Sequence, residues 1–308
     1  MKSARLIYNP TSGREQFKQS LPEVLQKFEE AGYVTSTHAT TAPDDGRTAA
    51  VKACQLGIDL LVVAGGDGTV SEVINGMAQC ENRPTLGVIP VGTVNDYASA
   101  LNISDDIFEA IDTILNGVSV DIDVGKMNDK YFMNISGGGK ITEVSYEAPS
   151  RLKSIIGPLA YYVKGIEFLP QMTSSEIRIE YDGEVFQGKV MLFLIGLTNS
   201  IGGFDKLVPE PIFNNGYFSL FIVKESSIIE LAQLMTLASR GEHMDHPKLL
   251  YIRAKDIKIE DENNAMQLNL DGEYGGKLPA HFKNLQSFLS IRVPKQTADT
   301  YFISKRLQ

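Results

Sequence analysis

The sequence predicts an α/β protein of two domains, an open and mostly parallel α/β sheet followed by an antiparallel β-sandwich. Three observations support this fold class. Short apolar strands alternate with helix-like segments as far as about residue 119, strand-rich segments dominate from residue 120, and glycine-rich loops follow several early strands. The first pattern is typical of parallel sheets covered by helices, and the second of antiparallel sandwiches. The predicted domains are 1–120 and 121–293. Residues from about 294 to 308 either stay with the second domain or return to the first, and the pattern leaves both open.

The first domain consists of repeated strand and helix segments. Its helical segments carry apolar residues at spacings of three and four, as at Phe17, Leu21, Val24 and Phe28. Its strands are short and rich in β-branched residues, and glycine ends the first helix at Gly32. The predicted strands are 5–8, 33–41, 59–64 and 85–89. The predicted helices are 15–31, 45–56, 70–78, 94–100 and 105–115.

The second domain alternates strand-like segments with short turns. Examples are VDIDVGKM, KYFMNIS, SEIRIEY, GYFSLFIV, DIKIE, MQLNL and FLSIRV. Two helical patterns interrupt these segments, near 159–168 and 228–239. Strands joined by short turns favour antiparallel pairing.

Composition limits the class of protein. A formal net charge of −9 over 308 residues argues against non-specific nucleic-acid binding, which needs a basic surface. Two cysteines, Cys54 and Cys80, make no disulfide framework and suit a reducing cytoplasm. The longest apolar run, 190–195, is far shorter than the roughly 20 residues of a membrane span. We therefore expect a cytoplasmic protein without a transmembrane segment, soluble or peripheral at the inner membrane surface.

Three loops of the first domain share one pattern of residues. The loops NPTSGRE (9–15), GGDGTVSE (65–72) and PVGTVND (90–96) each follow a strand, contain glycine and precede a helix. Each has the spacing of a capping box, with Ser12 and Glu15, Thr69 and Glu72, and Thr93 and Asp96. Helix N-termini at the carboxyl edge of a parallel sheet suit phosphate. Three capped helix starts without a ligand are the alternative, but the three together, with Asp67 among glycines, favour a nucleotide polyphosphate.

Two other nucleotide-binding patterns are absent from the sequence. It contains no G-x-x-x-x-G-K-[ST] and no G-x-G-x-x-G after the first strand. A P-loop kinase and a dinucleotide-binding redox fold are therefore not expected.

The segment QLNLDGEYGGK (267–277) contains a second candidate site. Asp271 and Glu273 flank a glycine at the end of an alternating strand. The chain contains the same tripeptide at Asp182-Gly183-Glu184, where it has the form of an Asp-Gly hairpin turn. The pattern at 271–273 therefore leaves both a turn and an acid/base site open.

The motifs together resemble a known family. NPTSG, GGDGT, PVGTVND and LDGEYGGK, at these intervals, are similar to those of the soluble bacterial diacylglycerol kinases. This family is related to sphingosine and ceramide kinases and, more distantly, to NAD kinases. The resemblance extends over nearly the whole chain and includes YEAPSRLKSIIGPLAYYVKG, GLTNS and TLASRGEH.

The resemblance implies both a fold and a reaction. The fold is that of the NAD kinase and diacylglycerol kinase group, with the active site in the cleft between the two domains. The reaction transfers the γ-phosphoryl group of ATP, with Mg²⁺, to the hydroxyl of diacylglycerol at the membrane surface. The product is phosphatidic acid, and the role is phospholipid recycling. A homodimer is also implied.

The resemblance also assigns residues by position. Asp271 and Glu273 match the pair that provides the general base, which fits a hydroxyl that must lose its proton on attack. Asp67 and Asp96 are candidates to hold Mg²⁺ directly or through water, although a turn and a cap are their alternative roles. The residues that match ATP-contacting motifs are Asn9, Pro10, Thr11, Ser12, Gly13, Thr40, Gly66, Asp67, Gly68, Thr69, Val70, Ser71, Glu72 and Thr93.

One loop departs from the family pattern. Family members bind a structural Mg²⁺ before a Gly-Tyr pair through one carboxylate and two backbone carbonyls. In VPEPIFNNGYF the carbonyls are those of Ile212 and Tyr217, and Asn215 stands where an aspartate is expected. An amide brings no charge to a hard cation. We therefore expect this metal site to be weak or empty.

Two further features remain open. Basic and apolar residues at 151–164 form either a membrane-facing surface or an ordinary packed helix. His243 and His246 have no third ligand in the sequence, and we expect them to be solvated or locally bonded.

Two other functions remain as alternatives. The first is an NAD kinase, against which NPTSG and the second domain argue. The second is a catalytically weakened paralogue that binds nucleotide or lipid, and its only support is Asn215. The intact carboxylates Asp67, Asp96, Asp271 and Glu273 argue against it.

Overall fold

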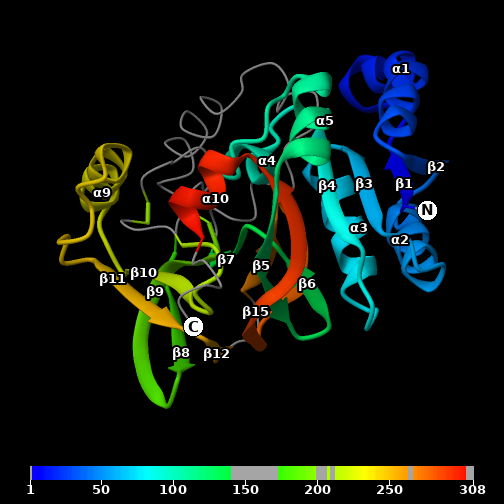
Figure 1. The fold of residues 1–308 in the computed structure, drawn as a ribbon. Coiled ribbons are helices and arrows are strands. Elements are labelled where there is room, and N and C mark those ends of the chain that lie inside the picture. Colours follow the sequence, from blue (N-terminus) through cyan, green and yellow to red (C-terminus); the bar gives the residue numbers. More distant parts are fainter. Residues whose placement is uncertain (1, 140–172, 199–206, 209–211, 263–265, 303–308) are drawn as a thin grey trace. The chain divides into compact units, whose positions relative to one another are not determined.

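The structure, a computed structural model, describes residues 2–139, 173–198, 207–208, 212–262 and 266–302 (Figure 1). The chain forms two compact units. Unit 1 is Met1–Asp123 with Ser287–Gln308, and unit 2 is Val124–Gln286. The returning segment begins inside a strand, β15 (Ala280–Val293), so this strand contributes residues to both units.

Unit 1 contains a parallel sheet. The sheet has the order β4, β3, β1, β2, and each of these neighbours runs parallel. The end of β15 adds to the free side of β4, where Ile291 lies beside Leu86 in parallel register. The predicted strands are confirmed, with bounds β1 (Lys2–Tyr8), β2 (Tyr33–Ala39), β3 (Leu60–Gly65) and β4 (Thr85–Pro90).

Helices connect these strands and cover both faces of the sheet. The step from β1 to β2 runs in one direction across the sheet, and the next two steps run in the other. Because such crossovers are right-handed, the first helix lies on one face and the next two on the other. The helices are α1 (Gln16–Glu30), α2 (Asp45–Gln55), α3 (Asp67–Met77), α4 (Asp96–Ala100), α5 (Ile107–Asn116) and α10 (Lys295–Tyr301).

The central strands of this sheet form the core of unit 1. All six residues of β3 are buried, which explains its continuous apolar sequence LLVVAG. No residue of the edge strand β2 is buried, and the strand has the polar sequence YVTSTHA. The helix α10 joins this unit through Thr297, whose hydroxyl donates a hydrogen bond to the carbonyl of Leu101 at 3.0 Å.

Unit 2 is the predicted antiparallel sandwich. The strand order is β14, β13, β7, β9, β8, β12, β15, with β10 and β11 paired beyond β9. Its core contains Phe132 stacked on Phe218 at 5.7 Å between ring centres. The strand β5 (Val118–Met127) contributes residues to both units, as β15 does. The other strands are β6 (Lys130–Phe132), β7 (Ile135–Gly139), β8 (Ser175–Tyr181), β9 (Glu184–Gly196), β10 (Phe218–Lys224), β11 (Leu249–Ala254), β12 (Asp256–Asp261), β13 (Gln267–Leu270) and β14 (Glu273–Lys277).

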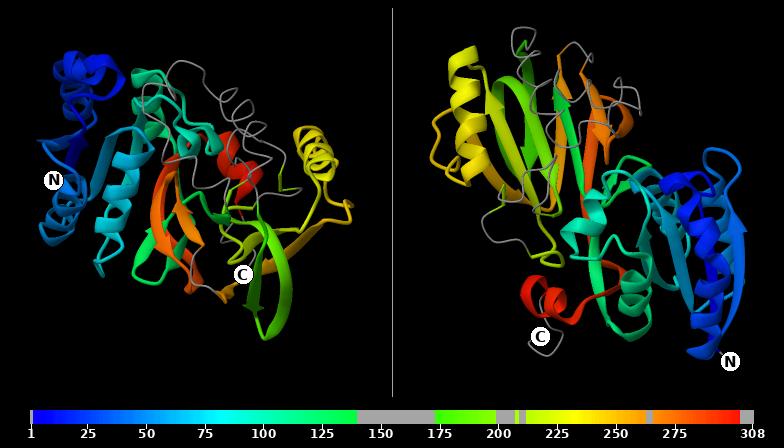
Figure 2. Two further views of the ribbon diagram at one scale, coloured as in Figure 1. Left: turned by 180° about the vertical axis from the view of Figure 1, so that it is seen from behind. Right: turned by 90° about the horizontal axis from the view of Figure 1, so that it is seen from above.

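One helix, α9 (Ile228–Arg240), lies alongside the strands of unit 2 (Figure 2). It begins with a complete capping box formed by Ser227 and Glu230, and it ends at Gly241 in the left-handed conformation. Its residues Leu231 and Leu234 pack on β9 and β10. The helix predicted at 228–239 is therefore confirmed. The helix predicted at 159–168 and the basic surface at 151–164 lie outside the described residues.

The described helices include none that is both long enough and apolar enough to cross a membrane.

His243 is a buried histidine in the segment after α9. Its side chain is 2% exposed, and Nε2 lies 3.1 Å from the carbonyl oxygen of Leu207. His246 is bonded locally, because its Nδ1 accepts a hydrogen bond from the N–H of Lys248. The expectation that both side chains are solvated or locally bonded is confirmed for His246. It is wrong for His243, which is buried and bonds to Leu207, far away in the sequence. Burial lowers the pKa of His243 below its usual 6.5, because a buried site disfavours the charged imidazolium.

We expect this histidine to weaken the fold in acid. The unfolded chain binds a proton at His243 as the pH falls through about 6.5, whereas the folded chain binds it only at lower pH. The free energy of unfolding should therefore decrease below that pH. Urea unfolding at several pH values from about 8 to 5, the range in which histidine titrates, measures this decrease in the free energy of unfolding. The variant His243→Gln should lose this part of the pH dependence, and an unchanged profile would contradict the prediction.

Candidate functional site

The three predicted loops lie together at the carboxyl edge of the unit 1 sheet. Backbone hydrogen bonds continue the parallel pairing one step beyond the strands. The N–H of Asn9 donates to the carbonyl of Ala64 at 3.0 Å, and that of Val91 donates to Gly65 at 3.1 Å. The loop after β2 is held in the same way, since the N–H of Thr40 donates to Tyr8 at 2.9 Å. Four loops therefore start in register at one edge.

Glycines bring three of these loops into direct contact. A Cβ atom at Gly13 would lie 2.7 Å from the carbonyl oxygen of Val91, and Gly13 has φ +56°. A Cβ atom at Gly92 would lie 2.4 Å from the Cα atom of Gly66. No side chain fits at either contact, so glycine is required there for close approach of the loops.

Asp67 joins the second loop to the third. It is the first residue of α3, and its carboxylate accepts hydrogen bonds from the N–H groups of Asp96 and Tyr97, both at 3.3 Å. Asp67 therefore binds the start of α4, which is more than the turn role considered for it from the sequence. Its negative charge also lies in the first turn of α3, where the helix dipole stabilises it.

Asn95 closes the third loop, and the sequence analysis did not single it out. It is 6% exposed and has φ 56°. Its Oδ1 accepts from the N–H of Gly92 at 2.9 Å, and its Nδ2 donates to the Gly92 carbonyl and to Asp105. The asparagine in PVGTVND was a usable signal, because asparagine is one of the few residues that adopts the left-handed conformation readily.

The capping boxes predicted at Thr69 and Thr93 are wrong. The helix α3 begins at Asp67 with Gly66 as its N-cap, which places Thr69 inside the helix rather than before it. The helix α4 has Asn95 as its N-cap without a side-chain capping bond. Glu72, which would complete the first box, bonds instead to the start of α2. At the first loop, Ser12 begins a short 3₁₀ turn, Ser12–Glu15, ahead of α1.

Glu72 binds a neighbouring helix instead of capping its own. Its two carboxylate oxygens accept from the N–H of Asp44 at 2.9 Å and from the N–H of Gly46 at 3.0 Å. These groups belong to the start of α2, whose N-cap Asp44 makes no capping bond of its own. Glu72 therefore links α3 to α2, so its predicted contact with ATP has no support in this geometry.

Replacement of Glu72 with alanine should lower the stability of unit 1. The exposed N–H of Asp44 and the partly buried N–H of Gly46 lose their acceptor. The loss at Gly46 accounts for most of an expected cost of about 1–3 kcal/mol in the free energy of unfolding. Glu72→Gln keeps one acceptor oxygen and should lose less. Chemical unfolding of both variants, with Glu81→Ala as an exposed carboxylate control, measures the difference. Equal stability of the alanine variant and the control would contradict this role.

The remaining residues predicted to contact ATP differ in their surroundings. Thr93 and Gly68 are exposed, and Asn9 and Thr11 form a turn in which Asn9 Oδ1 accepts from the N–H and the hydroxyl of Thr11. Val70 is 3% exposed and its N–H is bonded to Gly66. Its side chain therefore belongs to the core, and it directs no polar group toward a ligand.

In unit 2, Asp271 and Glu273 lie at the turn between β13 and β14. Asp271 has φ 47° and Gly272 has φ 89°, as in a tight hairpin turn. The carboxylate of Asp271 accepts three backbone hydrogen bonds, from Met133 at 2.8 Å and from Asn134 and Ile135 at 2.9 Å. Glu273 is exposed and makes no hydrogen bond to another described residue. The two carboxylates therefore have different surroundings.

The other DGE copy makes the same kind of turn. Asp182 has φ 47° and Gly183 φ 95°, which confirms the predicted hairpin between β8 and β9. The Asp182 carboxylate accepts from the N–H of Lys255 and of Asp256 at 2.9–3.1 Å. The aspartate of each copy therefore holds a neighbouring strand. The structure shows a tight turn at both copies, and the acid/base role of Asp271 and Glu273 stays a prediction.

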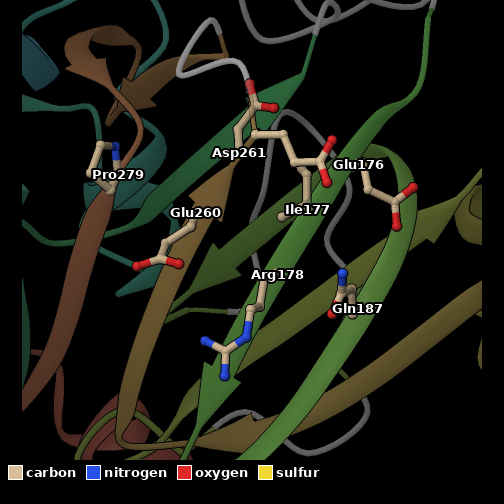
Figure 3. Close-up of a pocket in the computed structure, with 8 residues that line it drawn as sticks. Glu176, Ile177, Arg178, Gln187, Glu260, Asp261 and Pro279 are labelled. Atoms are coloured by element: carbon tan, nitrogen blue, oxygen red, sulfur yellow. The ribbon is translucent and has the colours of Figure 1, made fainter.

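A cavity of about 320 Å³ also opens on unit 2, between β8, β9 and β12 (Figure 3). Its charged lining comprises four carboxylates, Glu176, Glu260, Asp261 and Glu262, and one guanidinium, Arg178. The guanidinium forms an ion pair with Glu180. The excess of negative charge makes this cavity unsuitable for phosphate groups.

The loop predicted to hold a structural Mg²⁺ does not fit a divalent cation. The Asn215 Oδ1 atom accepts a hydrogen bond from the N–H of Tyr217 at 2.8 Å, so the expected ligand closes a turn of its own loop. Two cations, Arg253 and Lys255, lie over the Tyr217 ring at 4.8 and 4.5 Å. Ile212 can offer only a backbone carbonyl. Within the described ranges, no group of three or more His, Cys, Asp or Glu side chains is arranged to hold a metal.

Comparisons with known proteins agree with this fold and these loops. Residues 3–127 match the diacylglycerol kinase catalytic domain, and residues 142–293 match the YegS C-terminal NAD kinase beta sandwich-like domain. The diacylglycerol kinase of Staphylococcus carnosus is 54% identical over 304 residues, which cover 99% of each chain. That of Staphylococcus aureus is 55% identical over 303 residues, 98% of this chain and 96% of the relative.

A crystal structure of a diacylglycerol kinase from Bacillus anthracis aligns with a TM-score of 0.79. It is 27% identical and the alignment covers 95% of this chain and 97% of that one. The fold and the loops define a kinase with an α/β catalytic domain and a β-sandwich domain. The chain belongs to the diacylglycerol kinase family, as the sequence motifs predicted.

Proposed function

We propose that this kinase transfers the γ-phosphoryl group of MgATP to the free hydroxyl of diacylglycerol and releases phosphatidic acid. Support for the lipid substrate comes from relatives named diacylglycerol kinase that share 54–55% of their residues with this chain over nearly its full length. Support for the nucleotide comes from the close approach of three loops at the start of α3. Gly13 lies against Val91, and Gly92 lies against Gly66. Phospholipid recycling is the role that this reaction would serve.

The phosphates of ATP bind, in this proposal, to N–H groups at the start of α3 and in the adjoining loops. The first N–H groups of a helix have no partner inside it, and the dipole favours negative charge. The exposed Gly68 and Thr93 and the polar Asn9 loop adjoin this position. We assign the carboxylates of Asp67 and Asp96 as the charged groups that would hold the Mg²⁺ of MgATP.

Glu273 is the general base in this proposal, and Asp271 positions it. Three N–H donors occupy both oxygens of Asp271 and stabilise its ionised form, which makes it a poor proton acceptor. Glu273 has no such partners among the described residues, and one short rigid turn separates it from this anchor. Phosphoryl transfer depends mainly on positioning and charge stabilisation, so a fixed turn suits the base.

The structural Mg²⁺ of the family has no part in this mechanism. Asn215 lacks the charge and its oxygen serves a turn. Action at a membrane surface and assembly as a homodimer are further parts of the proposal, which rest on the resemblance to the family.

The test is ATP-dependent phosphorylation of diacylglycerol in mixed micelles with Mg²⁺ titrated. The native protein and Asn215→Asp are compared, with NAD as a parallel acceptor. We expect native activity with diacylglycerol and none with NAD. Activity only in Asn215→Asp would mean that the loop metal is needed after all. Phosphorylation of NAD alone, or of neither acceptor by either protein, would overturn the proposal.

A further inference from the structure

The two cysteines of the chain lie on neighbouring helices of unit 1. Cys54 is in the last turn of α2, and Cys80 follows the end of α3 at Met77. Both thiols are free, Cys54 is buried and Cys80 is partly exposed. Neither takes part in the proposed kinase reaction.

The packing of α2 on α3 places these two positions opposite each other. Residues four apart lie on one helix face, so 46, 50 and 54 share a face of α2, and 72 and 76 share one of α3, which ends at Met77, three residues before Cys80. A Cβ atom at Gly46 would lie 2.8 Å from Glu72 Oε2, and one at Gly76 would lie 2.8 Å from Ala50 Cβ. Continued by four more residues on each side, past the end of α3, the same pairing brings Cys80 opposite Cys54.

Contacts of the thiols agree with this register. Burial raises the pKa of the Cys54 thiol, and the neighbouring Cys80 thiol raises it further. Cys80 Sγ lies 3.6 Å from the carbonyl oxygen of Gly76, on the face of α3 that meets α2. The Cβ atoms of a disulfide are about 3.5–4.5 Å apart, a wider spacing than the one between positions 50 and 76. The two helices therefore approach each other closely at positions 50 and 76, about one turn before the cysteines.

We propose that Cys54 and Cys80 are a modification site, at which a peroxide forms a reversible disulfide within the chain. The Cys80 thiolate attacks one peroxide oxygen, the O–O bond breaks, and the leaving hydroxide is protonated to water. Cys80 is then a sulfenic acid. The Cys54 sulfur attacks the Cys80 sulfur, the S–O bond breaks, and the departing hydroxide takes the Cys54 proton. Two thiols are oxidised and one hydrogen peroxide is reduced to two waters.

The surroundings set the order of these steps. Cys80 is the accessible thiol and reacts first, whereas burial raises the pKa of the Cys54 thiol to about 12 and keeps it protonated. The positive charge of Arg83 opposes part of that increase at Cys54. Its guanidinium is fixed by a contact with the Phe288 ring at 3.9 Å.

The experiment treats the purified full chain with hydrogen peroxide, blocks remaining thiols with iodoacetamide and measures the intact mass. The native protein should lose two hydrogens, gain no blocking group and regain both thiols with dithiothreitol. Peptide mapping should join the peptides of Cys54 and Cys80. Cys54→Ser should instead gain oxygen atoms at Cys80, and Cys80→Ser should remain unoxidised at its buried Cys54.

A second measurement uses thermal unfolding. The bond closes a loop between α2 and α3, so the oxidised native protein should melt about 5 °C above the reduced form. Neither serine variant should show this increase. Oxygen addition to the native protein without loss of two hydrogens, or a disulfide between two chains on a non-reducing gel, would overturn the proposal.

Discussion

Replacement of Glu273 with glutamine should lower kcat for diacylglycerol phosphorylation by about 10²- to 10⁴-fold, which is the usual contribution of a positioned base. The substitution keeps the size and shape of the side chain and removes only its ability to take a proton. Because Glu273 is exposed and bonds to no other described residue, the variant should retain native stability. The KM for ATP should change little, since this carboxylate has no part in nucleotide binding.

The chain supplies a matched control for this prediction. Glu184 occupies the same place in the other DGE turn, and Glu184→Gln should leave kcat unchanged. Asp271→Asn tests the division of roles, because an amide can no longer accept from three N–H groups in the same way. We expect it to lose both stability and activity. A full loss of activity in Asp271→Asn with native stability, and normal activity in Glu273→Gln, would assign the base to Asp271.

Replacement of Gly92 with alanine should raise the KM for ATP by about 10- to 100-fold. The new Cβ atom would lie 2.4 Å from the Cα atom of Gly66 and 2.6 Å from Asn95 Oδ1. A Cα atom cannot move aside as a flexible side chain does, so the second and third loops must separate. Forced overpacking of this kind costs about 1–3 kcal/mol, and each 1.4 kcal/mol is about a tenfold change in affinity.

A different glycine separates loss of the site from general strain. Gly183 has φ +95° and open space around its Cα atom, so Gly183→Ala strains a turn of unit 2 without contact with the loops. It should lower stability and leave the KM for ATP unchanged. Steady-state kinetics with ATP varied at saturating diacylglycerol distinguishes the two variants. An unchanged KM in Gly92→Ala would exclude the loop contact from nucleotide binding.

The pattern of apolar residues predicted the elements well because it follows which faces of each element are buried, one face or both. The fully buried β3 is a continuous apolar run, and the amphipathic α1 carries apolar residues every three or four positions. The family motifs likewise identified the loops that meet at the sheet edge. These signals are local, and a single sequence displays them directly.

The errors arose where a side chain bonds to a distant segment. Thr69 and Glu72 have the spacing of a capping box, but Glu72 accepts from the start of α2, at Asp44 and Gly46. The two DGE tripeptides are identical in sequence, and only the neighbouring backbone shows that Asp271 is an anchor. Such partners are set by the tertiary fold, which no local pattern contains.

Asn215 stands where the family pattern predicts an aspartate, and the structure shows what its side chain does instead. The missing carboxylate predicted a weak metal site, and the described loop uses its amide in a turn with Tyr217. The carbonyl of Asn214 in the same loop accepts from Gln286 at 3.2 Å. Protein groups therefore hold this loop.

The return of β15 to unit 1 has a consequence for synthesis on the ribosome. Leu86 acquires its neighbour Ile291 only after about two hundred further residues have been made, and Ile291 and Val293 are completely buried in the finished fold. While the sandwich is being translated, the edge of β4 that later pairs with β15 therefore remains unpaired in the nascent first unit. Contacts of such long sequence separation slow folding and leave partly formed sheets open to aggregation. The last strand, rather than the first, is what completes the catalytic domain.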